Sequence, residues 1–331
     1  MPRETEWTNH FETSTHSCCT TDHARHGSCI VFLYAMANAA QFPGASSDSK
    51  LLMIHADDLG MCHSVNRAIM MALENGAVNS ASLMVPCPCF QEAAESARQH
   101  PGYDIGIHST LISEWESYRW GPVSQRDHGA DLVDDNGYFW PRNSLLQASP
   151  ERIHEEISAQ ITLAKQAGVE PTHLDSHMLS VARPGYISAY IRAAREFGLP
   201  FLIDEHWHAG ASREGTATAH DVVIDDLLQA HFKLSPDDLE EYYFSALRGL
   251  KPGLNMLIVH PGFDDDELRT ITAGCRPYGA AWRQRDFEIV MSAELQSALR
   301  ENGIQLVNWR TIKSAFGNQT GSLPAGRQRA V

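Results

Sequence analysis

The chain has 331 residues, of which 43% are hydrophobic and 20% charged, and its formal net charge at pH 7 is −15. This composition is typical of a globular protein large enough for one barrel-sized α/β domain. Because no basic stripe offsets the excess of carboxylates, the sequence argues against nucleic acid or an anionic membrane as a partner. The seven cysteines are irregularly spaced and predict no disulfide framework.

Residues 1–49 are expected to lie outside the folded domain as a disordered N-terminal segment. Residues 1–28 are polar and show no apolar periodicity. The uncharged run 29–40 has the length and the Ala-x-Ala exit of a signal-peptide core and is too short to span a membrane. It favours export to the periplasm or the medium. A cytoplasmic protein is the alternative, because the preceding region is long and contains carboxylates.

The segment 51–60 is an apolar run too short for a helix, and it ends in two adjacent carboxylates and a glycine. We predict a buried strand with Asp57 and Asp58 at its C-terminal tip. Adjacent carboxylates remain ionised in a closed cleft only beside a cation or strong donors, so a metal ion is the favoured partner. The structural alternative is that one aspartate caps a helix starting near Ser64.

From this strand onward, strand-like and helix-like segments alternate, which is typical of βα units and a parallel sheet. The predicted strands after the first are 78–85, 103–108, 172–177, 201–204, 254–259 and 304–307. The predicted helices are 64–73, 90–99, 150–168, 184–197, one beginning at Ser235-Pro236, and a last one over 287–300.

The connection 109–148 is long, carries no evident secondary structure and contains several aromatic residues. Connections of this length are usually functional loops. Trp115, Tyr118 and Trp120 are therefore candidate substrate contacts that could stack on a sugar ring, with simple packing of the loop as the alternative. Asp175, at the end of a later strand, is a further candidate contact.

Polar residues end four of the predicted strands: Asp57 and Asp58, His108, Asp175 and His177, and His260. The C-terminal ends of parallel strands converge in space, so these side chains should meet. One carboxylate and two imidazoles would hold a catalytic Zn²⁺ or similar ion and leave positions open for water and substrate. The residues alone leave open which aspartate and which two of the three histidines bind it. The remaining carboxylate could accept a proton and the remaining histidine could donate one.

Five segments match a known family in order: HADDLG (55–60), NGAVNSASLMV (75–85), GIH (106–108), THLDSH (172–177) and HPG (260–262). Through them the chain resembles the YdjC-like deacetylases, a family that includes chitooligosaccharide and hopanoid-biosynthesis deacetylases. The resemblance runs from about residue 51 to 310. The first and fourth segments together are specific, whereas HPG alone is a weak signal.

The resemblance implies a single-domain, distorted TIM-like (β/α) barrel of about seven strands, which we place over residues 50–312. The Gly/Ser/Arg-rich composition of the chain end predicts a flexible tail, 313–331. The resemblance also implies one divalent ion, with Zn²⁺ favoured over Mg²⁺, held by Asp58, His108 and His177. Asp57 would be the general base and His260 the general acid. The implied reaction is hydrolysis of an N-acetyl group from an amino sugar, oligosaccharide or glycoconjugate.

The chain also departs from the family pattern, since Met178, Leu179 and Ser180 follow His177 where members commonly have further histidines. The acetylated carbohydrate therefore need not be chitobiose. Whether the protein forms a homodimer is left open. Three alternatives remain: another metal-dependent amide or ester hydrolase, a non-haem Fe(II) oxygenase with the same ligand types, and a non-catalytic carbohydrate-binding relative. The repeated βα units argue against the oxygenase, and the intact Asp57/Asp58 pair argues against the non-catalytic protein.

Overall fold

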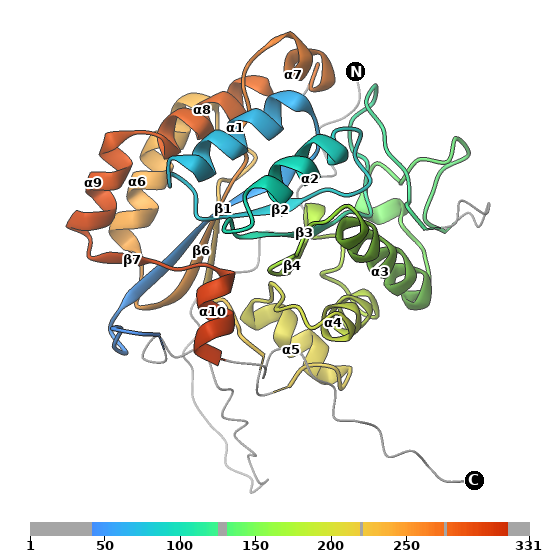
Figure 1. Cartoon of the computed structure of the whole chain (residues 1–331), viewed down its shortest axis with the longest axis horizontal. Helices are drawn as coiled ribbons and strands as arrows, with labels where there is room; N and C mark the ends of the chain where they lie inside the picture. Colours follow the sequence, from blue (N-terminus) through green and yellow to red (C-terminus); the bar gives the residue numbers. More distant parts are fainter. Residues whose placement is uncertain (1–41, 125–130, 219–220, 275–276, 317–331) are drawn as a thin grey trace, which may run out of the picture. The chain divides into compact units, whose positions relative to one another are not determined.

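The computed structural model describes residues 42–124, 131–218, 221–274 and 277–316. Within them, parallel strands form one curled sheet in the order β4-β3-β2-β1-β6-β5, and β7 pairs with the first residues of β1 (Figure 1). This arrangement confirms the predicted α/β class and the distorted barrel of about seven strands. The strands are β1 (Lys50–Leu59), β2 (Ser80–Leu83), β3 (Ile105–Ser109), β4 (Leu174–Ser176), β5 (Asp226–Gln229), β6 (Gly253–Val259) and β7 (Ile304–Leu306).

One predicted strand differs from the structure. Residues 201–204 form only isolated parallel bridges, from Phe201 to Leu174 on β4 and from Asp204 to Ile224, just before β5. The segment therefore spans the gap between the two edges of the sheet without a continuous ladder. The segment ends at Asp204, which is the N-cap of the next helix. The Asp204 side chain accepts a hydrogen bond from the Trp207 backbone N–H.

The helices lie around the curled sheet (Figure 1). The predicted last helix, 287–300, is wrong as one element: it is two helices, broken at Ser292, whose hydroxyl accepts from the Leu295 N–H and starts the second. α5, α7 and α10 were not predicted. The helices are α1 (His63–Glu74), α2 (Phe90–Gln99), α3 (Pro150–Gln166), α4 (Tyr186–Glu196), α5 (Glu205–Arg213), α6 (Leu239–Gly249), α7 (Asp266–Ile271), α8 (Ala280–Val290), α9 (Ala293–Glu301) and α10 (Trp309–Phe316), with short 3₁₀ turns η2 (Asn143–Leu145), η3 (His177–Leu179) and η4 (Pro236–Asp238).

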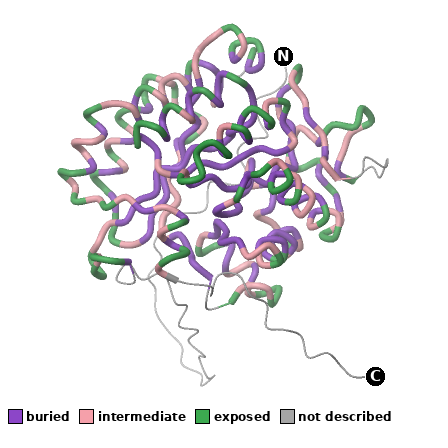
Figure 2. The backbone as a smooth tube through the Cα atoms, in the orientation of Figure 1, coloured by how far each residue is buried: buried purple, intermediate pink, exposed green. Residues whose placement is uncertain are grey.

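β1 is buried along nearly its whole length, as Figure 2 shows for the central strands. Its side chains alternate between two apolar clusters, because successive residues of a strand point to opposite faces. Leu52 and Ile54 pack in the cluster that includes the surrounding helices, whereas Leu51 and Met53 pack with Trp309 of α10 in a smaller cluster on the other face. His55 and Asp57 are alternate residues in step with Leu51 and Met53, so their side chains point to the same face of β1. This is the inner face of the curled sheet, and the candidate site residues lie on it.

The domain limits predicted from the sequence remain predictions. Phe42 is 2% exposed and packs in the smaller cluster, so the residues just before β1 belong to the folded unit. At the other end, the predicted limit at residue 312 falls inside α10. The candidate signal segment and the end of the predicted tail lie outside the described residues. Within those residues, no helix is long and apolar enough to cross a lipid bilayer.

Candidate metal centre

A bulge at the end of β1 turns both aspartates toward one site. The pairing of β1 with β2 runs from Ala56 opposite Ala81 to Leu59 opposite Leu83, so β1 contains one residue more than its partner over this interval. Asp58 takes up the irregularity with φ of 73°, a conformation that non-glycine residues rarely adopt. In a regular strand, adjacent residues would face opposite sides. The bulge therefore explains how neighbouring carboxylates can reach the same place.

Asp58, His108 and His177 bring one ligand atom each to a common point. Oδ1 of Asp58 lies 3.3 Å from Nδ1 of His177 and 3.6 Å from Nε2 of His108. Ligands bound tetrahedrally at Zn–N and Zn–O distances are separated by about 3.3 Å, so the spacing fits a metal ion. The three residues are at most 3% exposed, and Oδ1 of Asp58 is a buried atom with no hydrogen-bond partner among the described residues. Such an oxygen, facing two imidazole nitrogens, is well suited to bind a cation.

Each of these histidines presents its other ring nitrogen to a carboxylate. His177 Nε2 lies 3.0 Å from Oε2 of Glu114, and His108 Nδ1 lies 2.7 Å from Oδ1 of Asp175. Each of these nitrogens donates its hydrogen to the carboxylate, which leaves the opposite nitrogen free to bind a metal. Burial lowers the pKa of His177, but Glu114 and Asp58 outweigh it and raise the pKa to about 10. In the metal-free protein this imidazole therefore holds a proton that a metal ion would have to displace.

Arg283 of α8 forms the second contact of Asp58. Its Nη2 lies 2.6 Å from Oδ2 of Asp58, and the two side chains are 1% and 3% exposed. Burial raises the pKa of the Asp58 carboxyl, but Arg283 and the nearby histidines lower it well below its usual range. Arg283 was not among the residues predicted from the sequence. The available signal was a charged residue among the apolar residues of the helix 280–290, where Trp282 and Ile289 are buried together with Arg283 and Asp286.

Asp57 and His260 lie beside this centre and are its most accessible members, each 8% exposed. Oδ2 of Asp57 lies 3.7 Å from Nε2 of His260 and 3.7 Å from Nε2 of His108. Burial lowers the pKa of His260 to about 4, only partly offset by the two aspartates, so its imidazole is neutral at pH 7. Asp286, also missed from the sequence, accepts a hydrogen bond of 2.8 Å from the backbone N–H of His260 and fixes the segment after β6.

The four residues predicted as substrate contacts pack around the centre. Trp115 and Trp120 are 5% and 2% exposed, and Trp120 lies edge-on to the His177 ring with the centroids 6.2 Å apart. The hydroxyl of half-buried Tyr118 donates to the Met61 carbonyl. In this structure these aromatic residues pack the long connection around the centre, the alternative considered from the sequence. Asp175 is 1% exposed and lies behind His108, where it holds the His108 ring in place instead of facing an open surface.

All five residues predicted for the centre thus lie within one group of neighbouring side chains. The fold and this group define a class: a parallel (β/α) barrel with a buried His/Asp centre, at the C-terminal ends of its strands, that can hold a metal ion. Comparison with protein families matches residues 51–301 to the family described as YdjC-like protein. The chain belongs to this family.

Relatives and solved structures agree with this assignment. A protein named carbohydrate deacetylase from Thermoanaerobacter pseudethanolicus is 30% identical over 80% of this chain and 100% of its own length. A chitooligosaccharide deacetylase from Yersinia enterocolitica is 28% identical over 78% of this chain and 97% of its own. The crystal structure of a putative cellobiose-phosphate cleavage protein from Enterococcus faecalis, 26% identical, covers 80% of this chain and 99% of its own with a TM-score of 0.66. The similarity therefore spans essentially the whole length of these relatives.

Proposed function

We propose that this protein is a metal-dependent carbohydrate deacetylase that hydrolyses the N-acetyl group of an amino sugar, oligosaccharide or glycoconjugate. The observation that carries the proposal is the convergence of Asp58, His108 and His177, with the second nitrogen of each histidine held by a carboxylate. The names of the relatives supply the substrate class and the removal of an acetyl group.

Asp58, His108 and His177 would hold one divalent ion. Two imidazole nitrogens among three ligands favour Zn²⁺ over Mg²⁺, which prefers an all-oxygen environment. When bound, the ion supplies Lewis-acid polarisation of the acetamide carbonyl and lowers the pKa of water at the site. Arg283 holds Oδ2 of Asp58 in place, which leaves Oδ1 directed at the nitrogens of His177 and His108.

Asp57 would be the general base. Its Oδ2 faces the centre, and Asp57 is among the least buried members of the group, so it can take a proton from the attacking water. His260 would be the general acid. Because its imidazole is neutral at rest, its Nε2 can receive that proton from Asp57 Oδ2, 3.7 Å away, and deliver it to the departing amine nitrogen. The two side chains thus form a path from the water to the leaving group.

The test is acetate release by the full chain from a panel of N-acetylated and O-acetylated sugars. Metal is first removed with a chelator, and Zn²⁺ or Mg²⁺ is then added back. We expect release from at least one N-acetylated sugar that stops on chelation and returns with metal. Release only from O-acetyl sugars would indicate an ester hydrolase, and stoichiometric metal without release from any sugar would refute the carbohydrate deacetylase.

The oxygenase alternative has less support. Its facial triad also uses two histidines and one carboxylate, but Asp57 and His260 are additional proton-transfer groups beside the ligands, which hydrolysis requires and O₂ activation does not. Turnover that required O₂ and 2-oxoglutarate would favour the oxygenase.

A further inference from the structure

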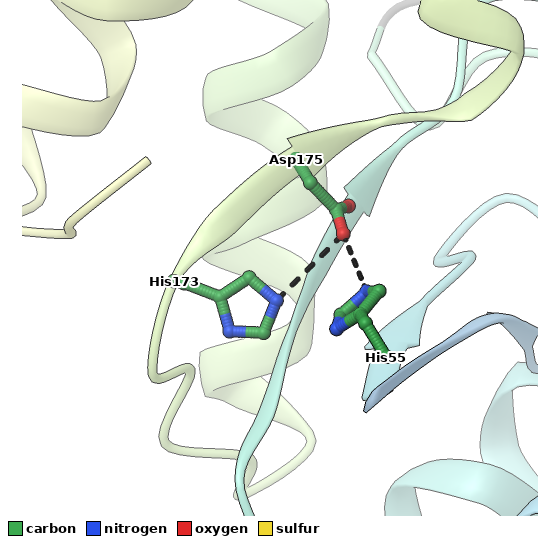
Figure 3. A group of neighbouring side chains, drawn as sticks. All are labelled: His55, His173 and Asp175. Atoms are coloured by element: carbon green, nitrogen blue, oxygen red, sulfur yellow. Dashed lines mark ion pairs between the residues drawn. The ribbon is translucent and has the colours of Figure 1, made fainter. Parts of the chain in front are cut away.

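His55 is a fully buried histidine that the proposed reaction does not use. It lies on β1 two residues before Asp57 and therefore on the same inner face of the sheet. Figure 3 shows its ring pointing at Asp175 of β4, which His173 approaches from the other side. His55 Nε2 lies 2.8 Å from Oδ2 of Asp175 and 3.2 Å from Oδ1 of Asp57. It thus contacts the predicted base and the carboxylate that orients His108.

The contacts of His55 fit a hydrogen on both ring nitrogens. Nε2 faces two carboxylate oxygens, which only accept hydrogen bonds, and the Ser82 hydroxyl, 3.1 Å away. Nδ1 lies 2.9 Å from the hydroxyl of Ser80, which also lies 3.2 Å from the Asp104 carboxylate. A serine hydroxyl has a single hydrogen, so when Ser80 donates it to Asp104 it accepts from Nδ1. This arrangement is that of an imidazolium.

Two buried carboxylates need this positive charge. Among the residues that the structure describes, no arginine or lysine forms an ion pair with Asp57 or Asp175, whereas Asp58 is already paired with Arg283. Uncompensated charges are costly to bury. The contacts with Asp175 and Asp57 outweigh the effect of burial and raise the pKa of His55 to about 10, in agreement with the hydrogen-bond pattern.

A second metal site at His55, His173 and Asp175 fits the distances less well. The 2.8 Å between His55 Nε2 and Asp175 Oδ2 is shorter than the separation of about 3.3 Å between ligands of one tetrahedral ion. The His173 ring also lies directly over Gly106, where a Cβ atom would be only 2.4 Å from it, and stacks on Trp309. The group is tightly packed around its own contacts.

We propose that His55 is a positioning residue for the centre. By holding Oδ1 of Asp57 it turns Oδ2 toward the reacting groups, and by holding Oδ2 of Asp175 it leaves Oδ1 on His108. The effect on turnover rests on the proposed deacetylase function, whereas the effect on metal binding through Asp175 and His108 does not. His55 would thus couple the base to a metal ligand through one buried cation.

The test compares His55→Leu, which removes the charge and the donor, with His55→Gln, which keeps a donor at the position of Nε2. Zn²⁺ affinity is measured by chelator competition, and kcat and KM are measured on the best acetylated sugar. For His55→Leu we expect Zn²⁺ affinity to fall about 10–100-fold and kcat about 100-fold, with KM changed less than about threefold. His55→Gln should recover about tenfold of both losses, because a hydrogen-bond donor remains.

The matched control is His208→Gln. His208 is another buried histidine, on α5, with Nε2 3.8 Å from Asp221. This variant should lose thermal stability and keep wild-type Zn²⁺ affinity and kcat.

Three outcomes would overturn the proposal: wild-type Zn²⁺ affinity and kcat in His55→Leu, equal losses in His208→Gln, or no recovery in His55→Gln. If the wild type deacetylates nothing, the proposed function fails, while Zn²⁺ affinity still decides the role of His55. If His55→Leu does not fold, ¹⁵N NMR of the wild-type imidazole at pH 8 decides. Two protonated ring nitrogens support the proposal, and one refutes it.

Discussion

Replacing Arg283 by methionine is the sharpest test of the electrostatics of the centre. The guanidinium lies 2.6 Å from Asp58 Oδ2, and both side chains are almost fully buried. Methionine keeps much of the volume of the side chain but leaves the buried Asp58 carboxylate with only the His177 imidazolium, 3.3 Å away, as a close positive charge. In the metal-free protein this should be destabilising, because removing one partner of a buried ion pair leaves much of the desolvation cost of the other uncompensated.

The magnitude follows from the separation and the burial. Two unit charges about 4 Å apart interact by roughly 4 kcal/mol at an effective dielectric constant of 20. Removing one partner of a buried pair typically costs about 3–5 kcal/mol. For a domain of this size, each kcal/mol lowers Tm by about 2–4 °C, so the metal-free variant should melt roughly 6–20 °C below wild type.

A bound divalent ion would compensate the same carboxylate and remove most of this loss. We therefore expect Zn²⁺ to raise Tm more in Arg283→Met than in wild type, and, by linkage, to bind the variant more tightly. The assay is thermal unfolding with chelator and with saturating Zn²⁺.

Arg195→Met is the matched control, because Arg195 pairs with buried Asp221 at 2.8 Å in another part of the fold. It should destabilise the protein equally with and without Zn²⁺. The reasoning would be refuted if Zn²⁺ raised the Tm of wild type, Arg283→Met and Arg195→Met by the same amount. It would also be refuted if metal-free Arg283→Met had the same Tm as metal-free wild type.

Three further predictions follow from the same geometry. His108→Ala and His177→Ala should lose stoichiometric metal in elemental analysis, whereas Asp57→Asn should keep the metal and lose about 10²–10⁴-fold in kcat; a fully active Asp57→Asn would exclude this residue as the base. Burial raises the pKa of Asp104, but hydrogen bonds from His173, Thr172 and the Arg310 N–H outweigh it and lower the pKa. The ionised form therefore stabilises the fold above about pH 4, and this contribution disappears as the pH falls further. Asp104→Asn should thus be less stable than wild type by roughly 1–3 kcal/mol in urea unfolding at pH 7, with a deficit that shrinks below pH 4; a deficit independent of pH would contradict the assignment. Finally, the N-terminus of the natural protein should lie after residue 40 if the segment 29–40 is a cleaved signal, and Edman sequencing that finds it before residue 29 would exclude export by this route.

Much of the fold could be predicted from the sequence because its signals are local. The apolar run before Asp57 predicts β1, and Ser149-Pro150 predicts the start of α3, where the Ser149 hydroxyl accepts from the Arg152 N–H. The errors also have local causes that compete with the periodicity. Ser292 provides a cap inside an apolar pattern and divides one predicted helix into two. Phe201 lies in a strand-like run but has a partner for only one bridge.

The candidate metal centre also has a part that could be predicted from the sequence and a part that could not. The sequence by itself placed Asp57, Asp58, His108, His177 and His260 at strand ends, and parallel strands bring such ends together whatever the details of packing. Only the tertiary structure decided their contacts. Arg283 reaches Asp58 across 225 residues of chain, Glu114 reaches His177 from a loop of irregular structure, and His55 lies between two carboxylates on different strands. The reason is physical: hydrophobic periodicity determines which face of an element is buried, whereas the partner of a buried charge depends on which distant segment is packed against it.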